Sequence, residues 1–362
     1  MAKTGTNKIT SFDVAERAGV SQTTVSLILS HRPGNNFTEE TRERVFRAAE
    51  ELGYRLPQRK HHLQSRLILV MIPTLTNQYY GELVQSLEQY CDTIGYRTII
   101  CNTFRKAELE KFYLDKFARD RISGIIYTFL PSFPAEVAEL AHRMPIVLVG
   151  EKTEELPICS IGLSNSRAGA MMAEHLFELG HRRVTFISTP MDRMTLARRQ
   201  RLDGLREKMR ELGEKAGEET HVTLCTSPDD SEQDALPGGI PFEYGIGKRL
   251  TDELIAGHTD STAFIGANDM IALGICGSLR EQGLSIPQDY SVCGFDNIFP
   301  SSMVTPGLTT VDHCLLARCR AAVNLIEEQS SAGSATPPGG NMADKIEFAP
   351  CFIPRGSTGP AR

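Results

Sequence analysis

The sequence predicts an α/β protein in which a three-helix N-terminal headpiece with a helix-turn-helix precedes two doubly wound parallel-sheet lobes. Short helical segments separated by tight turns occupy residues 9–53. From residue 67 onward, short apolar runs alternate with segments of helical period, which is typical of strands and helices joined by right-handed crossovers. This alternation occurs in two rounds, and the length of 362 residues suits two or three domains, so two similar lobes are expected.

The headpiece is expected to contain three short helices. Thr10, with Asp13 three residues later, predicts the start of the first helix, because a hydroxyl and a carboxylate both favour its free N–H groups; Gly19 ends it. Ser21 and Thr38 are the expected caps of the second and third helices. A helix, a tight turn with glycine and a second helix form the arrangement that reads the DNA major groove. A generic three-helix bundle with solvated arginines is the alternative.

Charge is distributed unevenly along the chain. The whole chain has 39 Lys and Arg against 45 Asp and Glu, a formal net charge of −6. Residues 1–66 hold 11 basic and 7 acidic side chains, or +4, which leaves −10 for residues 67–362. A basic head on an acidic body indicates that only the head binds nucleic acid. The expected phosphate partners there are Arg32, Arg42, Arg44, Arg47 and Arg55.

The sequence resembles a known family at both ends. The stretch ITSFDVAERAGVSQTTVSLILS, followed by FTEETRERVFRAAEELGYR, resembles the headpiece of the LacI/GalR family of bacterial transcription regulators. GANDMIALG, SVCGFDN, LTTV and FIPRGSTGPAR resemble later segments of that family in the same order. The resemblance implies a helix-turn-helix DNA-binding domain at 1–56, a hinge or linker at 57–66, and a periplasmic-binding-protein-like, two-lobed domain for effector binding and dimerisation at 67–362.

The expected DNA contacts combine residue type with this resemblance. Leu27 replaces an arginine that is frequent in the family, which favours a thymine methyl group or a different contact over bidentate readout of guanine. Leu63 matches a leucine that wedges into the minor groove from a hinge helix. Pro57 stands one place later than the family's pattern and the linker is short, so a flexible basic tether is the alternative. The expected DNA-binding residues are Thr10, Gln22, Thr23, Ser26, Leu27, Arg32, Arg55 and Leu63.

The body has candidate ligand contacts after its predicted strands. These strands are residues 67–72, 97–101, 124–128, 146–149, 184–187, 222–225, 263–267 and 291–295. Ligands of open α/β sheets bind beyond the carboxyl ends of the strands. An Arg, an Asn and an Asp, with Tyr79 and Phe242 as flat walls, suit a small polyhydroxylated ligand. In the alternative, Asn268 and Asp269 cap the helix at 269–282, Asp296 caps a turn, and both aromatic rings are core.

The resemblance assigns the site residue by residue. It implies that Arg201, Asn268 and Asp296 contact the effector, and that Tyr79, Thr128, Phe242 and His313 line the cleft. Gly150 and Ser164 stand where the family often has an aspartate, so one usual anchor for a sugar hydroxyl is absent. The segment 213–241 is polar and contains Gly and Pro, which predicts a long exposed loop.

These observations favour one function over two others. The favoured hypothesis is a ligand-responsive repressor that binds a pseudo-palindromic operator in double-stranded DNA as a homodimer, with a sugar-like effector between its lobes. A sugar-binding protein without a DNA function is the alternative, disfavoured by the headpiece and by the lack of a signal peptide. An enzyme is disfavoured because P-loop, G-x-S-x-G and HExxH motifs are missing. No cofactor or metal is expected, and the nine cysteines are interpreted as buried thiols. Because the sequence has no apolar run long enough to span a membrane, we expect a cytoplasmic protein.

Overall fold

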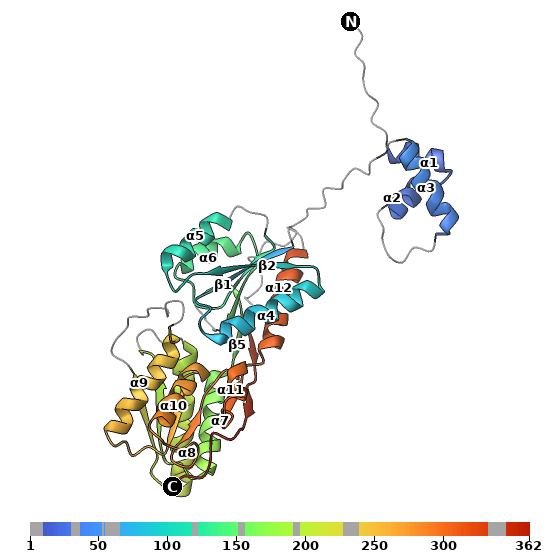
Figure 1. The fold of residues 1–362 in the computed structure, drawn as a ribbon. Coiled ribbons are helices and arrows are strands. Elements are labelled where there is room, and N and C mark those ends of the chain that lie inside the picture. Colours follow the sequence, from blue (N-terminus) through green and yellow to red (C-terminus); the bar gives the residue numbers. More distant parts are fainter. Residues whose placement is uncertain are drawn as a thin grey trace. The chain divides into compact units, whose positions relative to one another are not determined.

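The computed structural model describes residues 10–29, 37–52, 54, 66–117, 122–150, 156–190, 196–226, 239–331 and 345–362. The chain separates into two compact units, residues Met1–Gln64 and Ser65–Arg362 (Figure 1). The division falls inside the predicted linker at 57–66. None of the helices in the described ranges is long and apolar enough to cross a bilayer.

The N-terminal unit contains the three predicted helices, α1 (Ser11–Ala18), α2 (Gln22–Leu29) and α3 (Glu39–Glu51). Asp13 accepts hydrogen bonds from the backbone N–H of Thr10 at 2.6 Å and from its hydroxyl at 2.8 Å. Gly19 adopts φ +64°, and the Ser21 hydroxyl accepts from the Thr24 N–H at 3.1 Å, which starts α2. One small core joins the three helices, formed by Val14, Ala15, Ala18, Val25, Ile28, Val45, Ala48 and Ala49.

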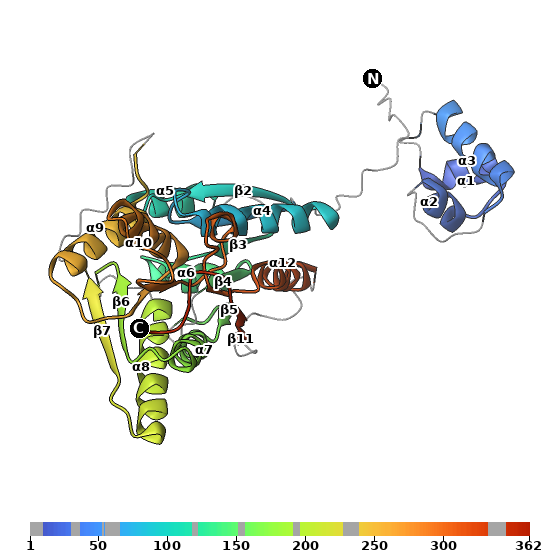
Figure 2. The same ribbon diagram turned by 60° about the horizontal axis from the view of Figure 1, so that its bottom comes forward.

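The N-terminal lobe of the second unit contains a six-stranded parallel sheet in the order β11-β5-β4-β3-β1-β2. Its strands are β1 (Leu67–Ile72), β2 (Arg97–Asn102), β3 (Gly124–Tyr127), β4 (Ile146–Gly150), β5 (Cys159–Leu163) and β11 (Lys345–Phe348). Alternate side chains of the strands point to opposite faces. One face packs against α4 (Gln78–Thr93) and α12 (Leu315–Ser331), and the other against α5 (Ala107–Phe117) and α6 (Pro134–Ala141) (Figure 2).

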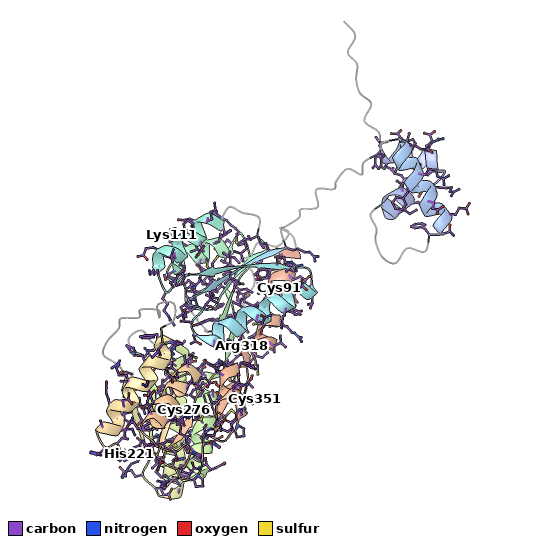
Figure 3. The ribbon with its side chains drawn as sticks, viewed as in Figure 1. Cys91, Lys111, His221, Cys276, Arg318 and Cys351 are labelled. Carbon is purple, nitrogen blue, oxygen red and sulfur yellow. The ribbon has the colours of Figure 1, made fainter. Side chains whose placement is uncertain are left out.

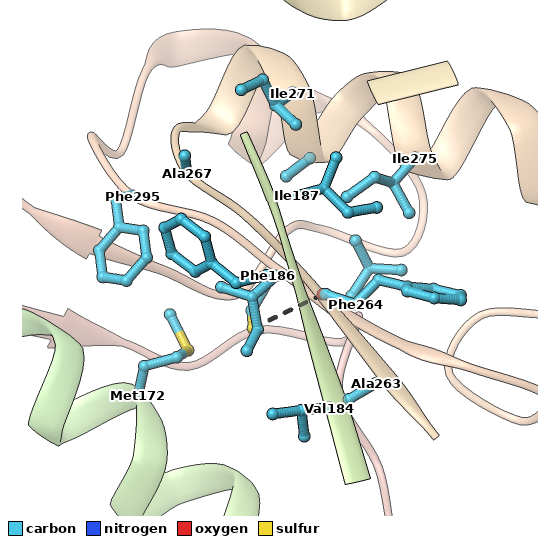
Figure 4. Close-up of a cluster of buried hydrophobic side chains, with 14 of the residues drawn as sticks. Met172, Val184, Phe186, Ile187, Ala263, Phe264, Ala267, Ile271, Ile275 and Phe295 are labelled. Carbon is cyan, nitrogen blue, oxygen red and sulfur yellow. Dashed lines mark hydrogen bonds between the residues drawn. The ribbon is translucent and has the colours of Figure 1, made fainter. Parts of the chain in front are cut away.

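The C-terminal lobe contains a four-stranded parallel sheet in the order β7-β6-β8-β9. Its strands are β6 (Arg183–Ser188), β7 (His221–Thr226), β8 (Ala263–Gly266) and β9 (Ser291–Cys293). Its helices are α7 (Asn165–Glu178), α8 (Leu196–Ala216), α9 (Phe242–Ala256), α10 (Asp269–Glu281) and the short α11 (Phe299–Met303). Phe186, Phe264 and Phe295 are fully buried between the layers and fill much of the core (Figure 4).

The chain passes between the lobes three times. β5 leads into α7, β10 (Thr310–Asp312) leads back into α12, and β11 leads into β12 (Cys351–Ile353), which pairs antiparallel with β10. Two late elements, α12 and β11, therefore belong to the N-terminal lobe. The sequence predicted two successive lobes and did not predict that the chain goes back to the N-terminal lobe. The spacing of apolar residues shows whether a segment is a helix or a strand, but it does not show to which lobe the segment belongs.

The expected long loop at 213–241 is wrong in its first half. Helix α8 continues to Ala216, and β7 follows within the same stretch. Pairs of charges one turn apart stabilise this last part of α8, including Arg210 with Glu214 at 2.8 Å and Lys215 with Glu211 at 2.5 Å. These pairs offset part of the helix-weakening effect of Gly213, and α8 ends before Gly217, which has φ +70°.

Candidate functional site

A pocket in the second unit covers about 550 Å³ of space that protein atoms do not fill, part of which is open to solvent. The carboxyl ends of strands from both sheets lead to it, which is the position expected for a ligand in α/β folds. Its lining residues come from both lobes: Asn77, Tyr79, Tyr80, Thr128, Gly150, Leu163, Asn165, Ala197, Arg198, Arg201, Asn268, Asp296, His313 and Arg318. Six of the seven expected effector residues are in this set.

Arg201 of α8 is at the centre of the polar network, with 6% of the residue exposed. Its Nε donates to the Asn165 side-chain oxygen at 3.0 Å, and one terminal nitrogen donates to the Ala267 carbonyl at 2.7 Å. The other terminal nitrogen is 3.2 Å from His313 Nε2 and 3.5 Å from the Asp296 carboxylate. All three nitrogens of the guanidinium are therefore fixed, and the ring of Phe295 lies beneath it at 5.1 Å.

Asp296 and His313 are coupled to this arginine. Burial lowers the pKa of His313 well below its usual value, with Arg201 and Arg318 adding to the effect, so the ring is neutral at pH 7. Because Arg201 donates to Nε2, the hydrogen of the ring is on Nδ1, which is 3.3 Å from the Asp296 carboxylate. Burial raises the pKa of Asp296 to about 6, against the opposing charge of Arg201.

The Asp296 backbone has φ +118°, a conformation that non-glycine residues rarely adopt. Its N–H donates to the Val311 carbonyl at 3.0 Å, and the next residue, Asn297, is held by Asp312 at 2.7 Å and by Arg355 at 2.6 Å. Strained backbone that its surroundings fix in this way is typical of functional sites.

Asn268 and Asp269 have separate roles. The Asn268 side-chain oxygen accepts from the Ile271 N–H at 3.0 Å, so Asn268 is the cap of α10 while it also lines the cavity. Asp269, which the alternative interpretation also made a cap of this helix, is instead fully buried and accepts from the hydroxyls of Ser301 at 2.6 Å and Thr310 at 2.7 Å. Burial raises its pKa to about 8, with a smaller contribution from Asp296.

Two residues from the N-terminal lobe complete the expected set. The Tyr79 ring meets the His313 ring edge-on, with centroids 6.0 Å apart, and the Thr128 hydroxyl donates to the Met71 carbonyl at 2.9 Å. Phe242 is the expected residue that does not line the cavity. It begins α9 and packs half-buried against the core of the C-terminal lobe.

Sequence reasoning did not assign Asn165 and Arg318 to the site. Asn165 follows β5, a strand that the sequence did not predict, and Arg318 is on α12, beyond the last predicted element. The sequence offers one local hint that Arg318 belongs to a site, because this arginine stands within the largely apolar run CLLARCRAA. The structure shows that its side chain is buried.

The expected DNA contacts are only partly within the described residues. Thr10 is exposed at the start of α1, and Gln22 is exposed at the start of α2, where its Nε2 donates to the Ser11 hydroxyl at 2.8 Å. Thr23, Ser26 and Leu27 follow on α2. Arg32, Arg55 and Leu63 lie outside the described residues.

No group of three or more His, Cys, Asp or Glu residues in the described ranges could hold a metal ion. The polar groups of the cavity, with guanidinium, carboxylate, amide and aromatic surfaces, are instead typical of a site for a small polar molecule.

Both units of the chain match known protein families. The family model "Bacterial regulatory proteins, lacI family" matches residues 12–56, and the family model "Periplasmic binding protein-like domain" matches residues 173–358. The HTH-type transcriptional repressor CytR of Escherichia coli (strain K12) is 30% identical over 353 residues, which is 96% of this chain and 95% of that protein. The HTH-type transcriptional regulator DegA of Bacillus subtilis (strain 168) is 28% identical over 360 residues, covering 98% and 99%.

A solved structure is similar to this chain over nearly its whole length. A LacI-family transcriptional regulator from Silicibacter pomeroyi is 26% identical, with a TM-score of 0.65 over 96% of this chain and 99% of that one. The chain therefore belongs to the LacI family of bacterial transcription regulators, which are DNA-binding proteins and not enzymes.

Proposed function

We propose that this chain represses transcription in the cytoplasm as a homodimer on a pseudo-palindromic operator, and that a small polyhydroxylated effector binds between its lobes. The observation that carries the proposal is the Arg201–Asp296–His313 network at a cavity lined from both lobes. Fixed donors and a carboxylate acceptor define the positions of ligand hydroxyls, and the Tyr79 ring offers a flat surface for C–H groups.

Solved structures of the same fold support a sugar-like ligand. A LacI-family regulator of Enterococcus faecium has bound ribose, and the regulator CelR forms a complex with cellobiose. We assign ligand contacts here to Arg201, Asn268 and Asp296, with Tyr79, Thr128 and His313 as lining residues. Phe242 is left out of the proposed site, because this first residue of α9 does not line the cavity and packs half-buried against the core of the C-terminal lobe.

The headpiece supplies the proposed DNA contacts. Gln22, Thr23 and Leu27 are assigned to base edges from α2, and Thr10, Ser26, Arg32 and Arg55 to the groove and backbone. Leu63 as a minor-groove wedge remains part of the proposal. Two headpieces on a two-fold dimer would read two half-sites related by the same symmetry.

The effector acts in this proposal by population shift. An effector that contacts both lobes stabilises one of their relative arrangements, and this arrangement has a different affinity for the operator. By linkage, the operator must change the affinity for the effector by the same factor.

The test combines selection of DNA with a ligand screen. Selection from random duplexes is expected to give a two-fold symmetric consensus, bound by a dimer in analytical ultracentrifugation, with an affinity that falls steeply as salt rises. A thermal-shift screen of sugars and nucleosides is expected to find a stabilising compound. Asp296→Ala should remove that compound's effect on operator binding and leave DNA binding without it intact. A flat salt dependence, or a full response in the Asp296 variant, would contradict the proposal.

A further inference from the structure

Arg318 is a fully buried arginine at the cavity, with 1% of the residue exposed. It is in the first turns of α12 and is located where the two lobes meet (Figure 3). Its Nε has no hydrogen-bond partner in the described structure. A buried charged group that is incompletely paired destabilises the fold, so its presence requires an explanation.

The partners that Arg318 does have are neutral and distant. Its terminal nitrogens are 3.5 Å from the Tyr79 hydroxyl, 3.5 Å from the His313 carbonyl and 3.4 Å from the Ile161 carbonyl. Among the residues that the structure describes, no carboxylate lies within 4 Å of this guanidinium. A typical strong N–H···O bond to an arginine is about 2.7–2.9 Å, so these three contacts only partly satisfy it.

The other two arginines of the cavity differ from Arg318 in this respect. Arg201 is 3.5 Å from Asp296, and Arg198 is 3.3 Å from Glu243. Both carboxylates that face the cavity or its edge are thus already engaged. Because Asp296 and Glu243 pair with the other two arginines, the positive charge of Arg318 is left without a carboxylate partner in the described part of the chain.

Space for a partner lies beside this guanidinium. Gly150 ends β4 with φ +116°, and a Cβ placed on it would lie 3.7 Å from an Arg318 terminal nitrogen and 4.0 Å from the Tyr79 hydroxyl. These are ordinary contact distances, so the glycine leaves room for an atom of a ligand next to the charge.

We propose that the effector of this protein carries an anionic group, a carboxylate or a phosphate on a polyhydroxylated frame, which Arg318 binds beside Gly150. The inference rests on the proposed function, in which the cavity is the effector site. The guanidinium would bind the anion through its fork of N–H groups, and the network at Arg201 and Asp296 would bind the hydroxyls.

The test uses simple anions and full-length protein. The melting temperature is measured in acetate and in inorganic phosphate, each against chloride at equal ionic strength, for the wild type, Arg318→Gln and Arg320→Gln. Arg320 is exposed, two residues along the same helix, so its substitution controls for loss of charge on α12. The wild type and the Arg320 variant should be stabilised in a saturable way by acetate or phosphate, and the better anion identifies the group. In Arg318→Gln the apparent affinity should fall by about tenfold or more.

Two further results separate this proposal from its alternatives. A merely structural Arg318 would make Arg318→Gln less stable without ligand, whereas removal of a poorly paired buried charge should leave stability unchanged or raise it. If Arg318→Gln does not fold, Arg318→Lys keeps the charge and should keep anion binding with reduced affinity. Absence of saturable anion binding in the wild type overturns the proposal. Equal stabilisation of the wild type and Arg318→Gln by neutral ribose or glucose overturns it too, while it supports the proposed function.

Discussion

Asn77 in the N-terminal lobe donates a hydrogen bond of 3.0 Å to Glu243 in the C-terminal lobe. Glu243 is 3% exposed, and it also accepts from Arg198 of its own lobe at 3.3 Å and is 3.8 Å from Arg105 of the other lobe. One buried carboxylate therefore joins both lobes at the edge of the cavity. Its removal would leave two arginines with one partner fewer, which favours separation of the lobes.

Glu243→Ala is expected to make the lobes open more often. Hydrogen bonds to charged groups contribute about 1.5–3 kcal/mol, so the amides at the starts of α4 and α9 should exchange with solvent about 10–100 times faster. Hydrogen exchange followed by mass spectrometry measures this directly. Glu139→Ala is the control, because Glu139 on α6 forms an exposed pair with Arg143, which lies just beyond the end of that helix. Unchanged exchange at both helix starts would rule out Glu243 as a link between the lobes.

Asp296 should make the stability of the second unit depend on pH. Its pKa is about 6 in the folded protein against an ordinary value of 3.8 for an aspartate in water, so between these values the folded state binds a proton that the unfolded state has lost. Its contribution to stability is therefore fully present below about pH 4 and is lost as the pH rises through about 6, with a slope of at most about 1.4 kcal/mol per pH unit. Asp269, whose pKa is about 8, acts in the same direction over a wider range.

Denaturant unfolding at pH 4, 5, 6, 7 and 8 tests this contribution. The wild type should lose more stability than Asp296→Asn across pH 4–6, and the two curves should run parallel above about pH 7. Parallel curves across the whole range would show that Asp296 titrates normally.

The parts of the site that sequence alone could predict are those next to predicted strands. Asn268 and Asp296 each follow a strand with a clear apolar pattern, so the carboxyl-end rule located them. Arg318 was missed because α12 belongs to a lobe that the chain left about 150 residues earlier, and such a return leaves no local pattern. Phe242 was expected to line the cleft, but the sequence cannot show whether an aromatic residue at the start of a helix faces a cavity or a core.

The close crossing of α7 and α8 is expected to support the position of Arg201. A Cβ added at Gly169 would collide with the Arg201 carbonyl oxygen, so Gly169→Ala must push the two helices apart. We expect a loss of about 1–3 kcal/mol in stability and weaker effector binding, because the guanidinium moves with its helix. Gly245→Ala is the matched control: its added Cβ would meet only Ile240 at 4.0 Å, so stability should stay equal or rise slightly. Calorimetric melting of both variants measures the difference, and equal melting temperatures would contradict the role of this contact.

Gln22 and Arg44 should affect operator binding in different ways. Gln22 is exposed at the start of α2, and Arg44 is exposed on α3. Gln22→Ala should change the preferred base at one position of each half-site, with a loss of about 1–3 kcal/mol in discrimination, because an amide pairs with base edges. Arg44→Ala should weaken all sequences alike and reduce the salt slope by about 1, because its charge binds a phosphate.

Fluorescence anisotropy with a set of singly substituted operators, each measured at several salt concentrations, separates the two effects. Glu43→Ala is the control on α3, since removal of an exposed acidic neighbour should leave base preference unchanged and affinity equal or higher. Base reading requires a contact that distinguishes sequences, whereas phosphate contact acts on every sequence through the same charge. A uniform loss of affinity in both variants would therefore show that α2 does not present Gln22 to the bases, and another element of the headpiece would have to read the operator.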